Sequence, residues 1–233
     1  GLTEDFPTAQ DDLRTFPSKS WKGLIFTGLE PSGLKACLKE MEARIGWMPI
    51  EKFEYDNSRN RYYEIRANWA LYVDNYLEGF HIPFVHKDLN SALDYDDYRT
   101  EIFDGGVLQI GIASDGEAIF EIPEDSPDNG LKVAAYYYWI YPGLMLNFYP
   151  WGLSVNLVLP LSVDRTRIEY YGFVWDKKFL GKGAGGDLDK VEEEDQFVVE
   201  STQRGVSSAT YERGRYSPSK EIGVHHFHQM LSS

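Results

Sequence analysis

Residues 68–89, NWALYVDNYLEGFHIPFVHKDL, decide the fold, because an aromatic helical pattern there carries Glu78, His81 and His86 with the spacing E-x2-H-x4-H. In one common mononuclear site, two neutral imidazoles and one carboxylate hold one face of Fe(II) and leave the opposite positions open for O2 and substrate. Glu78 and His81 are three residues apart and would share a helix face. A straight helix would not aim both imidazoles at one point, so we expect the helix to break near Ile82-Pro83 and to bring His86 back.

The same spacing also has an ordinary interpretation, since histidines in apolar sequence are often only hydrogen-bonded core or surface residues. A second segment, residues 191–215 (VEEEDQFVVESTQRGVSSATYERGR), has a helical pattern with an acidic N-terminal turn. Asp195 lies there just before Phe197-Val198-Val199, which helical spacing would point inward. A buried carboxylate is costly unless it has a partner, and a metal would be one. Alternatively, Asp195 is a solvated acid at a helix start, favoured by the helix dipole like Glu192–Glu194.

Together the two segments resemble the catalytic domain of the alpha subunit of Rieske-type non-haem iron oxygenases, also called aromatic-ring-hydroxylating oxygenases. The resemblance covers nearly the whole chain, and the run VDNYLEGFHIPFVHKDL is most similar to the choline and carnitine monooxygenase branch. The family motifs in this sequence are Asn68-Trp69, Asp74-Asn75-Tyr76, Glu78-x2-His81-x4-His86, Glu194-Asp195, Glu200-x2-Gln203-x-Gly205, Tyr211-x2-Gly214-Arg215 and Glu221-x3-His225-His226-Phe227-His228.

This resemblance implies that His81, His86 and Asp195 are the iron ligands. It implies that Glu78 is a bridging carboxylate that relays electrons from a neighbouring subunit; many members carry Asp at this position. The implied reaction is reductive activation of O2 at Fe(II) and insertion of oxygen into an arene or into a C–H bond next to nitrogen or oxygen. The implied partners are a small organic substrate, a reductase or ferredoxin that draws on NAD(P)H, and further copies of the chain in a homotrimer.

The sequence departs from the family at the electron source. A Rieske [2Fe-2S] cluster needs two cysteines and two histidines, whereas this chain has one cysteine, Cys37, and no histidine before His81. We therefore expect residues 1–30 to be a linker and first strand that follow a Rieske domain absent from this chain, and residues 31–233 to be the mononuclear iron catalytic domain. The alternative is a natural protein that lacks the cluster domain.

Composition limits the classes of partner. The net charge of −14 over 233 residues argues against nucleic acid and against anionic membranes. A single cysteine allows no intrachain disulfide, which suits the reducing cytoplasm. No apolar run approaches the length that a membrane span requires.

The order of the predicted elements, with strands gathered between a few helices and no β-α alternation, indicates an α+β fold with an antiparallel β-sheet. The resemblance further implies a helix-grip, Bet v1-like sheet with a long C-terminal helix packed across it and the iron between helix and sheet. The predicted strands are a single strand over 21–26, a hairpin of 48–56 and 61–66 across 57–60, two strands between 100 and 122 turning at 114–116, and four strands within 132–175.

Four further residues are candidates for the surroundings of the site. Asn75 is placed to hydrogen-bond to the metal ligands from behind. Asn147, Tyr149 and Trp151 would share one strand face and line the substrate pocket, although each aromatic ring could equally be sheet core. The choline-oxygenase-like motif favours a methylammonium substrate over an aromatic one. Two other functions fit the same pattern: a helix-grip binding module without an active metal, and a zinc hydrolase.

Overall fold

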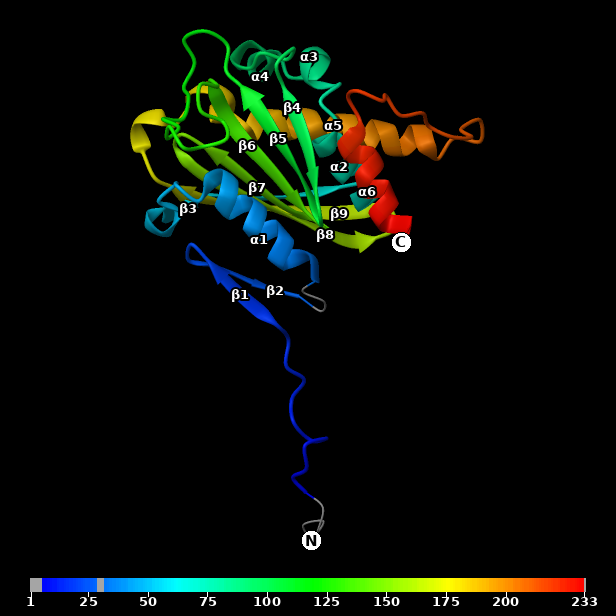
Figure 1. The fold of residues 1–233 in the computed structure, drawn as a ribbon. Coiled ribbons are helices and arrows are strands. Elements are labelled where there is room, and N and C mark those ends of the chain that lie inside the picture. Colours follow the sequence, from blue (N-terminus) through cyan, green and yellow to red (C-terminus); the bar gives the residue numbers. More distant parts are fainter. Residues whose placement is uncertain (1–5, 29–31, 233) are drawn as a thin grey trace.

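The centre of the molecule is one seven-stranded antiparallel sheet with helices on both faces (Figure 1), in a computed structural model that describes residues 6–28 and 32–232. The strand order is β3-β9-β8-β7-β6-β5-β4, so neighbours in the chain are mostly neighbours in the sheet. The strands are β3 (Glu54–Ile65), β4 (Arg99–Phe103), β5 (Gly106–Ile112), β6 (Val133–Ile140), β7 (Leu144–Tyr149), β8 (Gly152–Ser162) and β9 (Arg165–Val174).

Alternation along the strands divides the core into two layers. On β6, Tyr136 and Tyr138 pack toward α1 (Ser32–Ile45), whose buried side chains include Cys37 and Met41. Trp139, the residue after Tyr138, belongs to the opposite layer. Because successive side chains of a strand point to opposite faces, this aromatic strand can be buried on both sides. One face of the sheet therefore belongs to α1, and the other is free for the helices that build the site.

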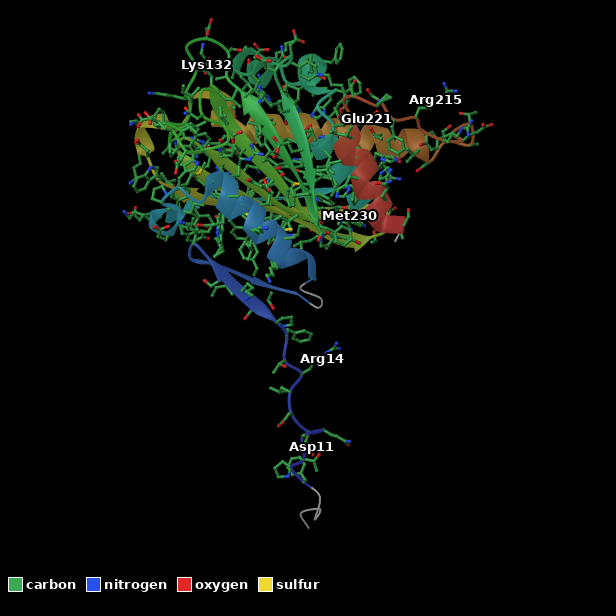
Figure 2. All side chains as sticks on the ribbon, in the orientation of Figure 1. Asp11, Arg14, Lys132, Arg215, Glu221 and Met230 are labelled. Carbon is green, nitrogen blue, oxygen red and sulfur yellow. The ribbon has the colours of Figure 1, made fainter. Side chains whose placement is uncertain are left out.

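That other face is covered by α2 (Trp69–Leu77), α5 (Leu188–Val206) and α6 (Ile222–Ser232). The rings of Trp139 and Phe227 meet edge to face with centroids 5.2 Å apart, an arrangement that aromatic pairs prefer. Figure 2 shows Met230 near the end of α6, and this residue packs against the same aromatic layer. The packing fixes α2 and α5 over the sheet; α5 carries Asp195, and the chain that follows α2 carries His81 and His86.

The N-terminal part of the chain corrects one prediction. Instead of a single strand over 21–26, the structure has a hairpin of β1 (Ser18–Trp21) and β2 (Leu24–Thr27). Lys22 and Gly23 form its turn with φ of 49° and 84°, the geometry of a type I′ turn. The hairpin lies next to α1, and its Trp21, Leu24 and Phe26 pack against the core, whereas the segment before it extends away from the sheet in Figure 1. Parts of the predicted linker, residues 1–5 and 29–30, lie outside the described residues.

Two further strand predictions are wrong in detail. Residues 57–60 do not turn a hairpin: both halves of β3 pair with the same strand, β9, and the four residues form an irregularity between Asp56 and Arg61. The second turn lies at Asp104-Gly105 and not at 114–116, because Gly105 supplies the positive φ of 85° that joins β4 to β5. Residues 114–132 contain no strand.

The predicted α+β fold with an antiparallel sheet is confirmed, and so are the four strands within 132–175, which are β6 to β9. The long helix across the sheet is α5, with α6 after it. Helix α5 ends at Val206, so the helix predicted over 191–215 is wrong beyond that residue. Within residues 6–28 and 32–232, we find no helix long and apolar enough to cross a membrane.

Candidate metal centre

The Glu-His-His motif forms a broken helix, but the break comes earlier than the sequence predicts. Helix α2 ends at Leu77, and Glu78 follows it with an extended backbone (φ −106°, ψ 135°). Helix α3 (Ile82–Val85) then begins with Pro83 in its first turn, where proline fits because no N–H is needed. Pro83 therefore starts a helix and does not break one, and Glu78 and His81 lie at a corner and not on one helix face.

The corner brings two imidazoles to one carboxylate from α5. Nε2 of His86 lies 3.0 Å, and Nε2 of His81 3.3 Å, from Oδ1 of Asp195. The two imidazole centroids are 4.9 Å apart with their planes at 79°. Among the described residues, these three offer ligand atoms that all lie within 4.8 Å of one another. The structure thus brings together the three predicted ligands, although more than 100 residues separate Asp195 from the histidines.

A second set of carboxylates holds the far edges of both imidazoles. Oε1 of Glu78 lies 2.5 Å from Nδ1 of His81, and Oε2 of Glu194 lies 2.8 Å from Nδ1 of His86. Asn75 donates from Nδ2 to Asp195 Oδ1 at 2.7 Å, as its predicted supporting position requires. Hydrogen bonds of this kind set the tautomer and the orientation of a ligating histidine. Both Nε2 atoms are therefore directed at the same point.

Charge and burial match this assignment. Burial opposes the charge of Asp195, but hydrogen bonds from His81 and His86 outweigh it and lower the pKa of Asp195 to about 2. Burial also opposes a proton on His81, yet its bonds to Asp195 and Glu78 raise the pKa of His81 to about 9. Burial likewise opposes a proton on His86, but its bonds to Asp195 and Glu194 raise the pKa of His86. The site therefore holds positive charge well beside its carboxylate.

The donor set fits Fe(II). Two imidazole nitrogens and one carboxylate on the same side are the ligands of the 2-His-1-carboxylate iron site, which leaves open positions for O2 and substrate. The described residues offer no cysteine near this point, since Cys37 is buried in the core beneath α1. The predicted alternative, a solvated Asp195, is not observed, because both histidines and Asn75 contact it.

A cavity of about 90 Å³ opens beside the three ligands. Asn147 and Tyr149 on β7 line it, as predicted. Trp151 does not: it stacks on Tyr149 at 5.3 Å and lines an adjacent cavity of about 130 Å³. Gly185 lies so close to Trp151 and Tyr149 that a Cβ there would clash with both. The wall between the two cavities is thus tightly packed.

Sequence reasoning missed the role of the acidic run before Asp195. Glu194, interpreted as a solvated acid, contacts His86, and Glu192 lines both cavities. The signal was available, because residues three apart share a helix face and Glu192 therefore accompanies Asp195. Of the apolar run that follows, Val199 is buried, but Phe197 is 72% exposed and does not point inward as predicted.

The terminal histidines lie apart from the three ligands. Nε2 of His228 lies 2.8 Å from Oδ1 of Asp74, and His225 is exposed on α6. The prediction that they serve a surface and not the metal agrees with this placement. Figure 2 labels Glu221, directly before α6.

Glu194→Ala is expected to weaken iron binding by about 10- to 100-fold, because it removes the carboxylate that accepts from Nδ1 of His86 and so orients this imidazole. The dissociation constant is measured by competition with a chromogenic chelator under anaerobic conditions. Glu193→Gln, at the exposed neighbouring position, removes the same charge and should leave the constant unchanged. Equal effects of both variants would show that only the net charge matters.

Comparison with known proteins relates this chain to one family. Residues 51–233 match the family described as "Ring hydroxylating alpha subunit (catalytic domain)". The chain is 38% identical over 178 residues to the chloroplastic choline monooxygenase of Arabidopsis thaliana, an alignment that covers 73% of this chain and 40% of the plant protein. It is 29% identical over 178 residues to the carnitine monooxygenase oxygenase subunit of Escherichia coli (strain K12), covering 71% of this chain and 46% of that subunit.

Solved structures agree on the fold. The quaternary ammonium Rieske monooxygenase CntA, in complex with an inhibitor, superposes with a TM-score of 0.71 at 19% identity, covering 98% of this chain and 64% of that protein. Naphthalene 1,2-dioxygenase with bound phenanthrene gives a TM-score of 0.63 at 11% identity, covering 92% and 63%. The chain spans about two fifths of the Arabidopsis protein. Since the family match covers most of the sequence and includes His81, His86 and Asp195, the chain belongs to the catalytic-domain family of ring-hydroxylating alpha subunits.

Proposed function

We propose that this chain is the catalytic domain of a non-haem iron oxygenase that hydroxylates a small methylammonium substrate. The observation that carries the proposal is the convergence of His81 Nε2, His86 Nε2 and Asp195 Oδ1 beside a cavity. Fe(II) bound there supplies reductive activation of O2 and insertion of oxygen into a C–H bond. The names of the choline and carnitine monooxygenases support a methylammonium substrate over an aromatic one.

The residues of the chain divide the remaining work. His81, His86 and Asp195 hold the metal on one side, while Glu78 and Glu194 keep both imidazoles oriented. Their positions are fixed before substrate arrives, which is how a protein lowers the cost of organising a reactive site.

The cavity orients the substrate and limits water. Tyr76 donates from its hydroxyl to Asn147 Oδ1 at 2.6 Å, and Gln109 donates to the carbonyl of Tyr76 at 2.7 Å. These bonds fix polar groups of the wall, so the wall offers few free donors to a polar competitor. A substrate with an apolar, methylated head would thus meet mainly tyrosine rings.

We propose that the electrons come from a Rieske domain that is not part of this sequence. A Rieske cluster needs two cysteines, and the chain has one. We infer that residues 1–30 lead from such a domain into the iron domain of residues 31–233, and that a reductase or ferredoxin using NAD(P)H reduces the cluster. Glu78, at the corner after α2, would receive the electron from a neighbouring copy in a homotrimer. The cytoplasmic location of the protein remains a prediction.

Metal analysis distinguishes the proposal from the two other functions. The chain is loaded anaerobically with Fe(II) or Zn(II), and the bound metal is counted per chain. We expect about one Fe(II) per chain, with nitric oxide binding detected by paramagnetic resonance because open positions remain. Zinc as the only metal that supports a reaction would favour a hydrolase, and a ligand bound in the cavity without any metal would favour a binding module.

A further inference from the structure

Glu192 is a carboxylate that forms no hydrogen bond with His81, His86 or Asp195 among the described residues. It lies on α5 one turn before Asp195 and lines both the iron-side cavity and the adjacent one. The hydroxyls of Tyr72 (2.9 Å) and Tyr170 both donate to its Oε2. Its other oxygen, Oε1, makes no hydrogen bond within the described residues. Among the described residues, no lysine, arginine or histidine forms an ion pair with Glu192.

A carboxylate in such a place is costly without a cation. Burial, followed by the negative charge of Asp195, raises the pKa of Glu192 to about 8, although the bonds from Tyr170 and Tyr72 oppose the shift. Burial and Asp195 thus disfavour the charged form of Glu192, and a cation placed beside Oε1 would favour it.

The wall of the iron-side cavity has the composition of a cation site, whereas Arg59 and Arg61 line the adjacent cavity. The residues that line the iron-side cavity include no lysine or arginine. Tyrosine rings attract cations through the negative faces of their π-systems, most strongly where water is excluded. The rings that line this cavity are Tyr72, Tyr76, Tyr98, Tyr137 and Tyr149.

We propose that Glu192, together with these tyrosine rings, binds the positively charged head of the substrate and selects it over a neutral molecule of the same shape. The inference deepens the proposed function and rests on it for the position of the reacting carbon. Glu192 is a positioning residue here: the cation is held by its charge, and the methyl groups of the cation are thereby brought beside His81, His86 and Asp195.

The test compares two ligands of nearly the same shape. Choline carries a trimethylammonium group, and 3,3-dimethylbutan-1-ol carries a neutral tert-butyl group in its place. Binding of each to the iron-loaded chain is measured anaerobically by calorimetry, without turnover. We expect the wild-type chain to bind choline at least about tenfold more tightly than the alcohol.

Three variants separate charge from shape. Glu192→Gln should lose at least about tenfold in choline affinity while its affinity for the alcohol stays the same. Glu192→Asp, which keeps the charge, should retain a preference for choline. Glu193→Gln, which removes one charge from the exposed side of α5, should match the wild type for both ligands.

Several outcomes would overturn the inference. One is equal affinity of the wild-type chain for choline and the alcohol, and another is an unchanged choline affinity in Glu192→Gln. A third is an equal loss of affinity for both ligands in that variant, which would mean that Glu192 affects only the shape of the cavity. Iron content is measured on every sample: if Glu192→Gln lost iron, the residue would serve the metal instead. Failure of the wild-type chain to take up iron would count against the proposed function, whereas choline selectivity of the metal-free chain would still be measurable.

Discussion

A His86→Ala variant is expected to purify with less than about a tenth of the wild-type iron. His86 is one of three protein ligands, and its side chain is 1% exposed between Asp195 and Glu194. Loss of an outer partner of a ligand already weakens metal binding by about 10- to 100-fold, and loss of the ligand itself should cost more. The expectation extends to His81→Ala and Asp195→Ala, since each removes another ligand. Metal analysis after anaerobic reconstitution gives the result.

The fold should survive the same substitution. The aromatic core layers lie in the sheet beneath α1 and under α6, away from His86. Loss of its two hydrogen bonds should lower the free energy of unfolding of the metal-free chain by about 2 kcal/mol, and the melting temperature by about 4–8 °C. His225→Ala, an imidazole lost from the exposed side of α6, is the matched control and should keep its iron. Full iron occupancy in His86→Ala would refute the ligand assignment.

The sheet was predictable where strand residues share a simple alternation. The runs that became β6 to β9 are dense in aromatic and branched residues and are separated by Pro, Gly and Asp, so strand signals and turn signals agree. Residues 57–60 carry equally strong turn signals, yet they form an irregularity within β3 because β9 pairs with both flanks. Turn propensity is local, and the partner of a strand is not.

The metal site was predictable for a different reason. Spacing alone left His81 and His86 as possible core residues and Asp195 as a possible solvated acid, and only the resemblance joined them. The carboxylates behind the imidazoles could not be assigned in that way. Glu194 and Glu192 cannot be told apart within an acidic run of sequence. Their different partners depend on how α5 is rotated about its axis relative to α2 and the sheet. The apolar residues of α5 do not predict this rotation, because Phe197 is exposed.

The second large effect concerns Glu78. Its Oε1 contacts Nδ1 of His81, and its Oε2 accepts a hydrogen bond from the backbone N–H of Phe80 at 2.5 Å. The side chain is 17% exposed at the corner after α2, with one oxygen on His81. We propose that a donating imidazole of the cluster on a neighbouring subunit binds at this side chain.

Glu78→Gln should therefore keep the iron and slow its reduction in the protein that also carries the cluster. The amide oxygen of glutamine can still accept from His81 Nδ1, so iron content should stay within about twofold of the wild type, less than the 10- to 100-fold loss expected when such a partner is removed entirely. A bond between a carboxylate and a cationic or donating imidazole is about twice as strong as a neutral one, and the amide gives up that advantage. We expect oxidation of the pre-reduced cluster in a single turnover to slow by about 10- to 100-fold.

Absorbance of the cluster during a single turnover, together with the iron content of the same sample, decides between three roles of Glu78. Glu221→Gln is the matched control, because Glu221 and Glu78 are both close enough to Asp74 to add to the rise that burial causes in its pKa. A slow reaction with full iron supports the bridge only if the control reacts at the wild-type rate. A wild-type rate in Glu78→Gln would dismiss the bridge. Loss of iron would mean that the charge of Glu78 is needed to hold His81 on the metal, and electron transfer would then have to enter through another side chain.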